Sequence, residues 1–193
     1  MGEKRKTGIG VLGDIPWGSH FCLFYREKQD LIDSLAPFFK EGLEGGEFCI
    51  WVVSKPLSVQ EAEEAMKEVL PEFERYPGKM EILQDTGWYL KDGALNAEKM
   101  LEAWVEKHNW AVAGGFKGLR AAGDGTLFKK DHWAHFCAYE HSVNRLITEH
   151  QMIAACAYRL GECGASEAID IIQRHQWAVI VRGGKCELLK GTG

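Results

Sequence analysis

The chain alternates short apolar runs with longer amphipathic segments. The first two apolar runs are residues 20–25 (HFCLFY) and 48–54 (FCIWVVS). Between them, apolar residues recur at the spacing of one helix face: Leu31, Leu35, Phe38, Phe39 and Leu43. A strand, a helix and a second strand in this order predict a parallel βαβ unit. Pro37 predicts a kink or a break in the helix, because proline removes a backbone donor.

The same alternation continues to the end of the chain. Further strands are predicted at residues 79–84, 116–124 and 152–159, and two more at 177–190, joined at Gly183 and Gly184. Further helices are predicted at 58–74, 97–113, 130–150 and up to 175, with N-caps at Ser58, Asn96 and Ser166. The run 152–159 is almost continuously apolar, which predicts a central strand. The pattern as a whole predicts a leader at residues 1–18 and a single three-layer α/β domain at 19–193, with a mostly parallel sheet and a C-terminal β-hairpin.

Composition and charge narrow the class of protein. Of the 193 residues, 46% are hydrophobic and 26% charged, which is ordinary for a globular domain. The formal net charge of −5 argues against a nucleic-acid-binding surface, and the basic run at residues 4–6 is interpreted as a solvated tail. No apolar stretch reaches the roughly 18 to 20 residues that a membrane span needs. We therefore expect a cytoplasmic protein that binds neither nucleic acid nor membrane directly.

Two segments stand where a nucleotide-binding protein would bind its nucleotide, and neither has the features that such a site requires. Gly8, Gly10 and Gly13 form a literal GxGxxG, but only seven residues, mostly polar or basic, precede it, so the strand that the dinucleotide fingerprint requires is not expected. The turn after Tyr25 reads REKQD; it has no glycine, and carboxylates stand where phosphate would bind. This turn is a poor phosphate site.

The six cysteines form no redox or metal motif, because no CxxC occurs. Cys22, Cys49 and Cys156 lie in predicted strands, where a free thiol behaves as a small hydrophobic side chain. We interpret these three as inert core thiols.

Several segments resemble the MEDS family, the methanogen/methylotroph, DcmR-type sensory domains. The resemblance covers about residues 14–180, and the segments that carry it are 17–25 (WGSHFCLFY), 38–47 (FFKEGLEGGE), 49–52 (CIWV), 87–93 (GWYLKDG), 100–104 (MLEAW), 119–124 (LRAAGD), Tyr139, Glu140 and Asn144. It implies a sensor of small molecules, hydrocarbon derivatives among them, usually fused to an output module. No such module is recognised in this sequence, so we expect either signalling through a separate histidine kinase or transcriptional regulator, or an excised or stand-alone sensor. A homodimer is a further possibility. The opening is similar, more distantly, to RecA/KaiC-type ATPases, from which this chain differs in lacking the phosphate loop.

Candidate ligand-binding residues come from two arguments. Tyr25, Asp124 and Tyr158 end predicted strands, and ligands of parallel α/β sheets bind outside the carboxyl ends of strands. His20 and Cys22 match the family's GxHxC pattern, and the resemblance also favours Glu140 as a polar anchor. The aromatic residue Trp88 lies in a predicted loop and is a candidate wall for an apolar or methylated ligand.

A metal or haem site is the alternative. The segment 131–141 is rich in histidine, and its candidate ligands are His132, His135, Cys137 and His141. These four cannot all face one ion from a single helix, so a site would combine two of them with His20 or Cys22. No particular cofactor is identified by the sequence.

Three functions therefore remain. The first is a non-enzymatic sensory domain for a small, largely apolar molecule. The second is a metal- or haem-binding redox or gas sensor, and the third a degenerate RecA/KaiC-type nucleotide-binding protein. Since no catalytic triad, HExxH or nucleophile elbow is present, no reaction is assigned.

Overall fold

The computed structural model describes residues 3–86, 90–91, 94–95, 97–125 and 133–189. The strands are β1 (Lys4–Lys6), β2 (Asp14–Pro16), β3 (Ser19–Tyr25), β4 (Phe48–Val53), β5 (Met80–Gln84), β6 (Leu90–Lys91), β7 (Ala94–Leu95), β8 (Leu119–Asp124), β9 (Met152–Arg159), β10 (Trp177–Arg182) and β11 (Lys185–Leu189). The helices are α1 (Lys28–Glu44), α2 (Val59–Val69), the short 3₁₀-helix η1 (Phe73–Arg75), α4 (Ala97–Ala113), α5 (Trp133–Glu149) and α6 (Ala165–Arg174). None of the described helices is long and apolar enough to cross a bilayer.

The main sheet has seven strands in the order β11-β10-β3-β9-β8-β4-β5. Every neighbouring pair is parallel except β10 and β11, which form the predicted C-terminal hairpin. β9 is the middle strand, as its continuous apolar sequence predicts. The α/β class, the mostly parallel sheet and the hairpin are therefore confirmed.

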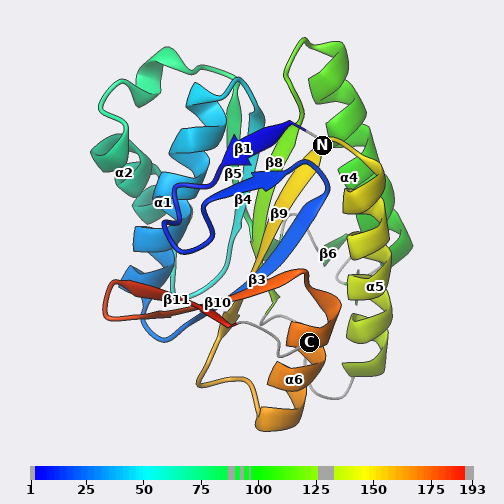
Figure 1. Ribbon diagram of the computed structural model, residues 1–193. Helices are drawn as coiled ribbons and strands as arrows, with labels where there is room; N and C mark the ends of the chain where they lie inside the picture. The colour runs from blue at the N-terminus through cyan, green and yellow to red at the C-terminus, as the bar shows by residue number, and fades with distance from the viewer. Residues whose placement is uncertain (1–2, 87–89, 92–93, 96, 126–132, 190–193) are drawn as a thin grey trace.

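Helices cover both faces of the sheet, which gives the three layers (Figure 1). α1 and α2 lie on one side, and α4, α5 and α6 on the other. Alternation along β3 divides its side chains: Phe21, Leu23 and Tyr25 join the core under α1, whereas Cys22 and Phe24 join the core near α5 and α6. We call these two sides of the sheet the α1 face and the α5 face.

The leader packs against the domain. β1 and β2 pair as a short antiparallel ribbon, and Ile9 and Ile15 are buried in the core of the α1 face. The interpretation of residues 4–6 as a solvated tail is wrong, because Arg5 is only 7% exposed and its Nε lies 2.7 Å from Oε1 of the buried Glu47. A short strand does precede the glycines at 8, 10 and 13, but these glycines lead to a second strand and not to a phosphate-binding helix.

The observed helix ends agree only in part with those predicted from the sequence. Ser58 and Glu61 form the predicted capping box of α2. α1 runs unbroken through Pro37, so the predicted break is absent. α6 begins two residues earlier than its expected cap allows, because Gly164, and not Ser166, is the N-cap.

Candidate ligand-binding site

Four side chains that can bind a metal or a polar ligand meet on the α5 face. Parallel pairing of β3 with β9 aligns His20 with Ala154 and Cys22 with Cys156, so His20 and Cys156 project from adjacent strands toward α5. Glu140 comes from the buried side of α5, and His175 follows α6 directly. We call His20, Glu140, Cys156 and His175 the polar cluster; one ligand atom from each lies within 4.8 Å of the others.

The contacts within the polar cluster are close. His20 Nε2 lies 3.2 Å from Cys156 Sγ and 3.7 Å from Glu140 Oε2. His175 Nε2 lies 3.4 Å from the same Glu140 oxygen, and the two imidazole centroids are 4.1 Å apart. His20 is fully buried, and Glu140 and His175 are 3% and 9% exposed. Three of the four groups are therefore buried, and Cys156 is half-buried.

Buried polar atoms without a hydrogen-bond partner concentrate here. In the described part of the chain there are eight such side-chain atoms, and five lie in or beside the polar cluster: His20 Nδ1, Glu140 Oε2, Asn144 Oδ1, Tyr158 Oη and His175 Nε2. Because an unpartnered buried polar group costs about 1–3 kcal/mol, proteins rarely gather them without a function. Such a concentration is typical of a site prepared for a ligand.

Burial sets the protonation of the polar cluster. It lowers the pKa of His20 well below the ordinary value, and neighbouring His175 lowers it further, although Asn144 opposes the shift. Burial also lowers the pKa of His175 to about 4. The pKa of Glu140 is raised by burial to about 7, with Tyr158 and Arg174 opposing the rise. Both imidazoles are thus neutral at pH 7 and present lone pairs.

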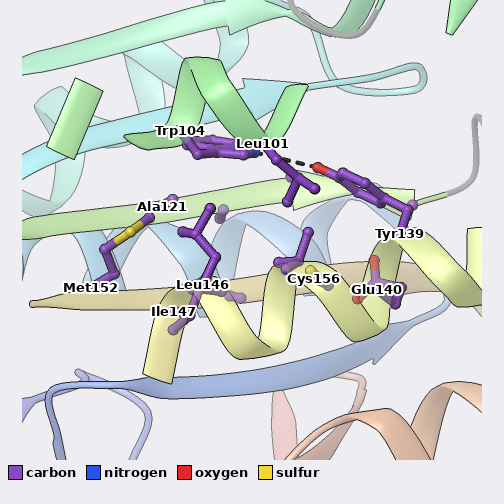
Figure 2. Close-up of a pocket in the computed structure, with 15 residues that line it drawn as sticks. Leu101, Trp104, Ala121, Tyr139, Glu140, Leu146, Ile147, Met152 and Cys156 are labelled. Atoms are coloured by element: carbon purple, nitrogen blue, oxygen red, sulfur yellow. Dashed lines mark hydrogen bonds between the residues drawn. The ribbon is translucent and has the colours of Figure 1, made fainter. Parts of the chain in front are cut away.

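An apolar cavity adjoins the polar cluster. It measures ≈ 40 Å³ and lies between α4, α5, β8 and β9. Figure 2 shows Met152, Ala121, Leu146 and Ile147 toward one end and Glu140 with Cys156 toward the other, while Trp104 donates a hydrogen bond to the Tyr139 hydroxyl at 3.3 Å. Glu140 and Cys156 therefore belong to both the cluster and the cavity wall.

The carboxyl edge of the sheet is organised differently. The Tyr25 hydroxyl donates to Asp124 Oδ2 at 2.5 Å, and both residues are buried. Burial, and then the charge of Asp124, raise the pKa of Tyr25. Tyr158 does not join this pair, because it packs on the α5 face with Phe24 and Phe136. The structure thus brings together two of the three strand-end candidates and separates the third.

The strand-to-helix turn is occupied by the chain's own carboxylate. Asp30 Oδ2 accepts hydrogen bonds from the backbone N–H groups of Arg26 and Glu27, at 3.3 and 3.1 Å. Burial alone would raise the pKa of Asp30, but these bonds and those from Gly183 and Gly184 outweigh it, and the pKa is lowered. Backbone donors that would hold a phosphate at a helix N-terminus are thus already used, as the missing glycines predict.

The other candidate residues are dispersed. Cys22 lies beside the polar cluster, but its Sγ donates to the Trp177 carbonyl at 3.6 Å. His135 and His141 are exposed on α5, Cys137 is half-buried, and none of the three belongs to a metal-type group in the described ranges. Trp88 and His132 lie outside the described residues. Of the predicted metal ligands that lie in the described ranges, only His20 therefore belongs to such a group.

Cys156 and His175 were missed by the sequence analysis. Cys156 lies in an apolar strand, where an inert thiol is the ordinary interpretation, and His175 lies at a helix end. The one available signal was alternation: Cys156 is two residues from Tyr158 and shares its face of β9. Recognising the cluster also required the order of β10, β3 and β9 in the sheet.

Comparison with known proteins establishes the family. The family model described as "MEDS: MEthanogen/methylotroph, DcmR Sensory domain" matches residues 19–176. The chain belongs to the MEDS family. Among curated proteins it is similar to the transcriptional repressor DcmR of Methylorubrum extorquens (strain DSM 6343 / CIP 106787 / DM4), with 22% identity over 184 residues. The match covers 90% of this chain but 64% of DcmR, so this MEDS domain spans less than two thirds of that relative.

Solved structures show the same fold. A KaiC-like protein from Pyrococcus horikoshii OT3 matches with a TM-score of 0.61 and 15% identity, covering 93% of this chain and 81% of that one. The flagellar accessory protein FlaH from Methanocaldococcus jannaschii matches with the same TM-score and 12% identity, with the same two coverages. The MEDS domain therefore has a RecA/KaiC-like fold. The match to the sensory-domain family supports a sensory role.

Proposed function

We propose that this MEDS domain is a non-enzymatic sensor that binds a small, largely apolar molecule in the cavity of the α5 face. A hydrocarbon derivative or a methylated compound would suit it. The observation that carries the proposal is that an apolar cavity ends at Glu140, whose Oε2 is buried without a hydrogen-bond partner. Apolar walls with few convergent polar groups are the usual composition of small-molecule sites.

The size of the cavity limits the ligand. Since roughly 10–15 Å³ of such space holds one water, ≈ 40 Å³ corresponds to about three water-sized positions. A molecule of a few non-hydrogen atoms would fit, with its apolar part against Leu101, Leu146 and Met152 and a polar end toward Glu140. Larger ligands would need α4 or α5 to move.

α5 is the element through which binding would be signalled. Its inner side contributes Glu140, Val143 and Leu146 to the cavity, while His141 and Arg145 on its outer side are exposed. A ligand that binds better to one position of α5 shifts the population toward it and changes the outer surface. The similarity to a transcriptional repressor supports a transcriptional regulator as the partner that reads this surface.

The experiment compares ligand binding in two tryptophan variants of α5. Leu146→Trp fills the cavity, and Arg145→Trp places the same side chain on the exposed side of the helix. Thermal unfolding is followed with methanol, butanol, trimethylamine and short alkanes as probes. At 100 times its Kd, a bound probe adds about 2.7 kcal/mol, or roughly 5–10 °C in Tm for a domain of this size.

We expect at least one probe to stabilise the wild type and Arg145→Trp equally, and to lose its effect in Leu146→Trp. Tyr25→Phe, at the carboxyl edge, should leave the effect unchanged. Equal stabilisation of Leu146→Trp, or loss of the effect in Tyr25→Phe, would place the ligand elsewhere and contradict the proposal. No stabilisation by any small molecule would also contradict it.

A further inference from the structure

We propose that His20, Glu140, Cys156 and His175 form a tetrahedral binding site for a divalent cation of the zinc class. The proposed ion site shares Glu140 and Cys156 with the wall of the small-molecule cavity, but it does not require a ligand there, because it rests on the geometry of the polar cluster. It also differs from the sequence-based metal site, whose ligands would come from α5. Only His20 is shared between the two sets.

Two of the three shortest distances within the cluster match the edges of a tetrahedron around an ion, and the third is slightly shorter. With Zn–N and Zn–O bonds of about 2.0–2.2 Å and Zn–S of about 2.3 Å, ligand atoms of a tetrahedral site are about 3.3–3.7 Å apart. The observed separations are 3.4 Å for His175 Nε2 to Glu140 Oε2, 3.7 Å for His20 Nε2 to Glu140 Oε2 and 3.2 Å for His20 Nε2 to Cys156 Sγ. The four side chains need little movement to surround one ion.

Hydrogen bonding fixes which atoms face the centre. His175 Nδ1 lies 2.7 Å from the Ile171 carbonyl oxygen, which can only accept, so this nitrogen carries the proton. Nε2 of the neutral ring then presents a lone pair to Glu140 Oε2. When Glu140 is ionised, this lone pair and the carboxylate oxygen repel each other, and a cation between them removes the repulsion.

A shared proton explains the contacts less well. A proton held between Glu140 and His175 would draw the two atoms to about 2.7–2.9 Å, shorter than the observed 3.4 Å. It would also leave Glu140 at 3.7 Å from His20 with no hydrogen bond between them. An ion accounts for both separations at once.

The outer contacts resemble those of known metal sites. The Ile171 carbonyl orients the His175 ring, as carbonyls and carboxylates commonly orient metal-binding imidazoles. The Asn144 side chain lies beside His20, and its Oδ1 has no other hydrogen-bond partner. An Nδ1–H of His20 directed to that amide would leave Nε2 for the ion.

The donor set selects the ion. Two imidazoles, one thiolate and one carboxylate suit Zn²⁺, Co²⁺ or Fe²⁺, whereas Mg²⁺ and Ca²⁺ prefer oxygen ligands alone. A dication also balances the two negative ligands in a buried site. Because the four protein ligands would surround the ion on all sides, no open plane remains for a porphyrin. The geometry therefore favours a single ion over haem. Four protein ligands are typical of a closed, non-catalytic site, which agrees with a sensory domain.

The experiment is a cobalt titration of the full chain after removal of metal with a chelator. We expect one Co²⁺ per chain, with the thiolate-to-metal charge-transfer band and the intense visible bands of tetrahedral cobalt. One equivalent of Zn²⁺ should remove these bands, because zinc binds more tightly. Cys156→Ser should lose the charge-transfer band, and His175→Ala should lower the affinity at least tenfold.

Matched controls lie on α5. Cys137→Ser and His141→Ala change the same residue types outside the cluster and should leave stoichiometry, spectrum and affinity unchanged. Failure of the wild type to bind cobalt or zinc would overturn the proposal, as would an unchanged spectrum in Cys156→Ser or a lost one in Cys137→Ser. If a cluster variant does not fold, X-ray absorption of the zinc-loaded wild type replaces it: one sulfur and three nitrogen or oxygen ligands support the site, and any other sulfur count contradicts it.

This result is separable from the small-molecule proposal. Leu146→Trp should abolish probe binding and leave cobalt binding intact. Metal binding without probe binding would support the ion site and contradict the sensor cavity, and the reverse result would contradict the ion site alone.

Discussion

The two faces of the sheet both bury charged or polar side chains, but they satisfy them differently. On the α1 face, the guanidinium of Arg120 donates to both oxygens of Glu47 and to the carbonyls of Phe38 and Lys6. Arg5 adds a second cation to Glu47. On the α5 face, Glu140 and His175 face each other with Oε2 and Nε2 unpartnered.

The difference separates a structural role from a binding role. Arg120 and Glu47 are fully buried and have their hydrogen bonds within the protein, so this network holds the leader and α1 on the sheet. The polar cluster is also largely buried, but several of its polar atoms have no hydrogen-bond partner. Burial alone therefore does not distinguish the two groups of side chains, whereas buried polar atoms without hydrogen-bond partners do, which supports the proposed binding role of the α5 face.

The largest expected effect on stability is on the α1 face, where the buried charges are paired. Arg120→Met should lower the free energy of unfolding by about 3–5 kcal/mol, because it leaves the Glu47 carboxylate buried with one of its two cations removed. Urea unfolding measures the change. Arg145→Met, which removes an arginine with 79% of its side chain exposed, should change stability by less than about 0.5 kcal/mol. Equal effects of the two substitutions would show that the network is not structural.

On the α5 face, we expect a substitution to raise the free energy of unfolding instead of lowering it. Glu140→Met replaces a buried carboxyl, whose Oε2 has no hydrogen-bond partner, by an apolar side chain of similar size, and should raise the stability of chelator-treated protein by about 1–2 kcal/mol. The same urea experiment applies. A loss of more than about 1 kcal/mol would mean that Glu140 has a structural partner, and the contrast between the faces would disappear.

The smallest effect concerns the turn before α1. The pKa of Asp30 is lowered in the folded state, so its charge contributes stability above the unfolded pKa, and that stability is lost as pH falls through the folded value. Asp30→Asn should therefore cost about 1 kcal/mol at pH 7 and almost nothing near pH 2. Unfolding curves of both proteins across this range give the difference. A difference that does not depend on pH would contradict the role assigned to the carboxylate.

Periodicity alone predicted the arrangement of strands and helices, because each element of the main sheet buries an apolar run or stripe. It failed at Arg5, where a basic residue in a short polar segment gave no sign of the buried partner Glu47 more than 40 positions away. Periodicity did predict α1, which continues through Pro37 without the break that the proline allowed.

The candidate site was also predicted only in part, because its residues meet through contacts that are not local in the sequence. The family resemblance singled out His20 and Glu140, and both lie in the polar cluster. Cys156 and His175 complete it only because β9 and β10 flank β3, which is a non-local fact of sheet order. The strand-end argument placed Tyr25, Asp124 and Tyr158 at one crevice, but it did not take into account that Tyr25 and Tyr158 project to opposite faces.

The most direct test of the account is a methyl NMR titration of the wild-type domain with the probe that stabilises it most. The account predicts that Leu101, Val143 and Leu146 on the α5 face shift, while Val53 and Leu57 on the α1 face do not. Shifts centred on Val53 and Leu57, or none at the three cavity residues, would contradict the claim that the α5 face is the sensory side of this MEDS domain.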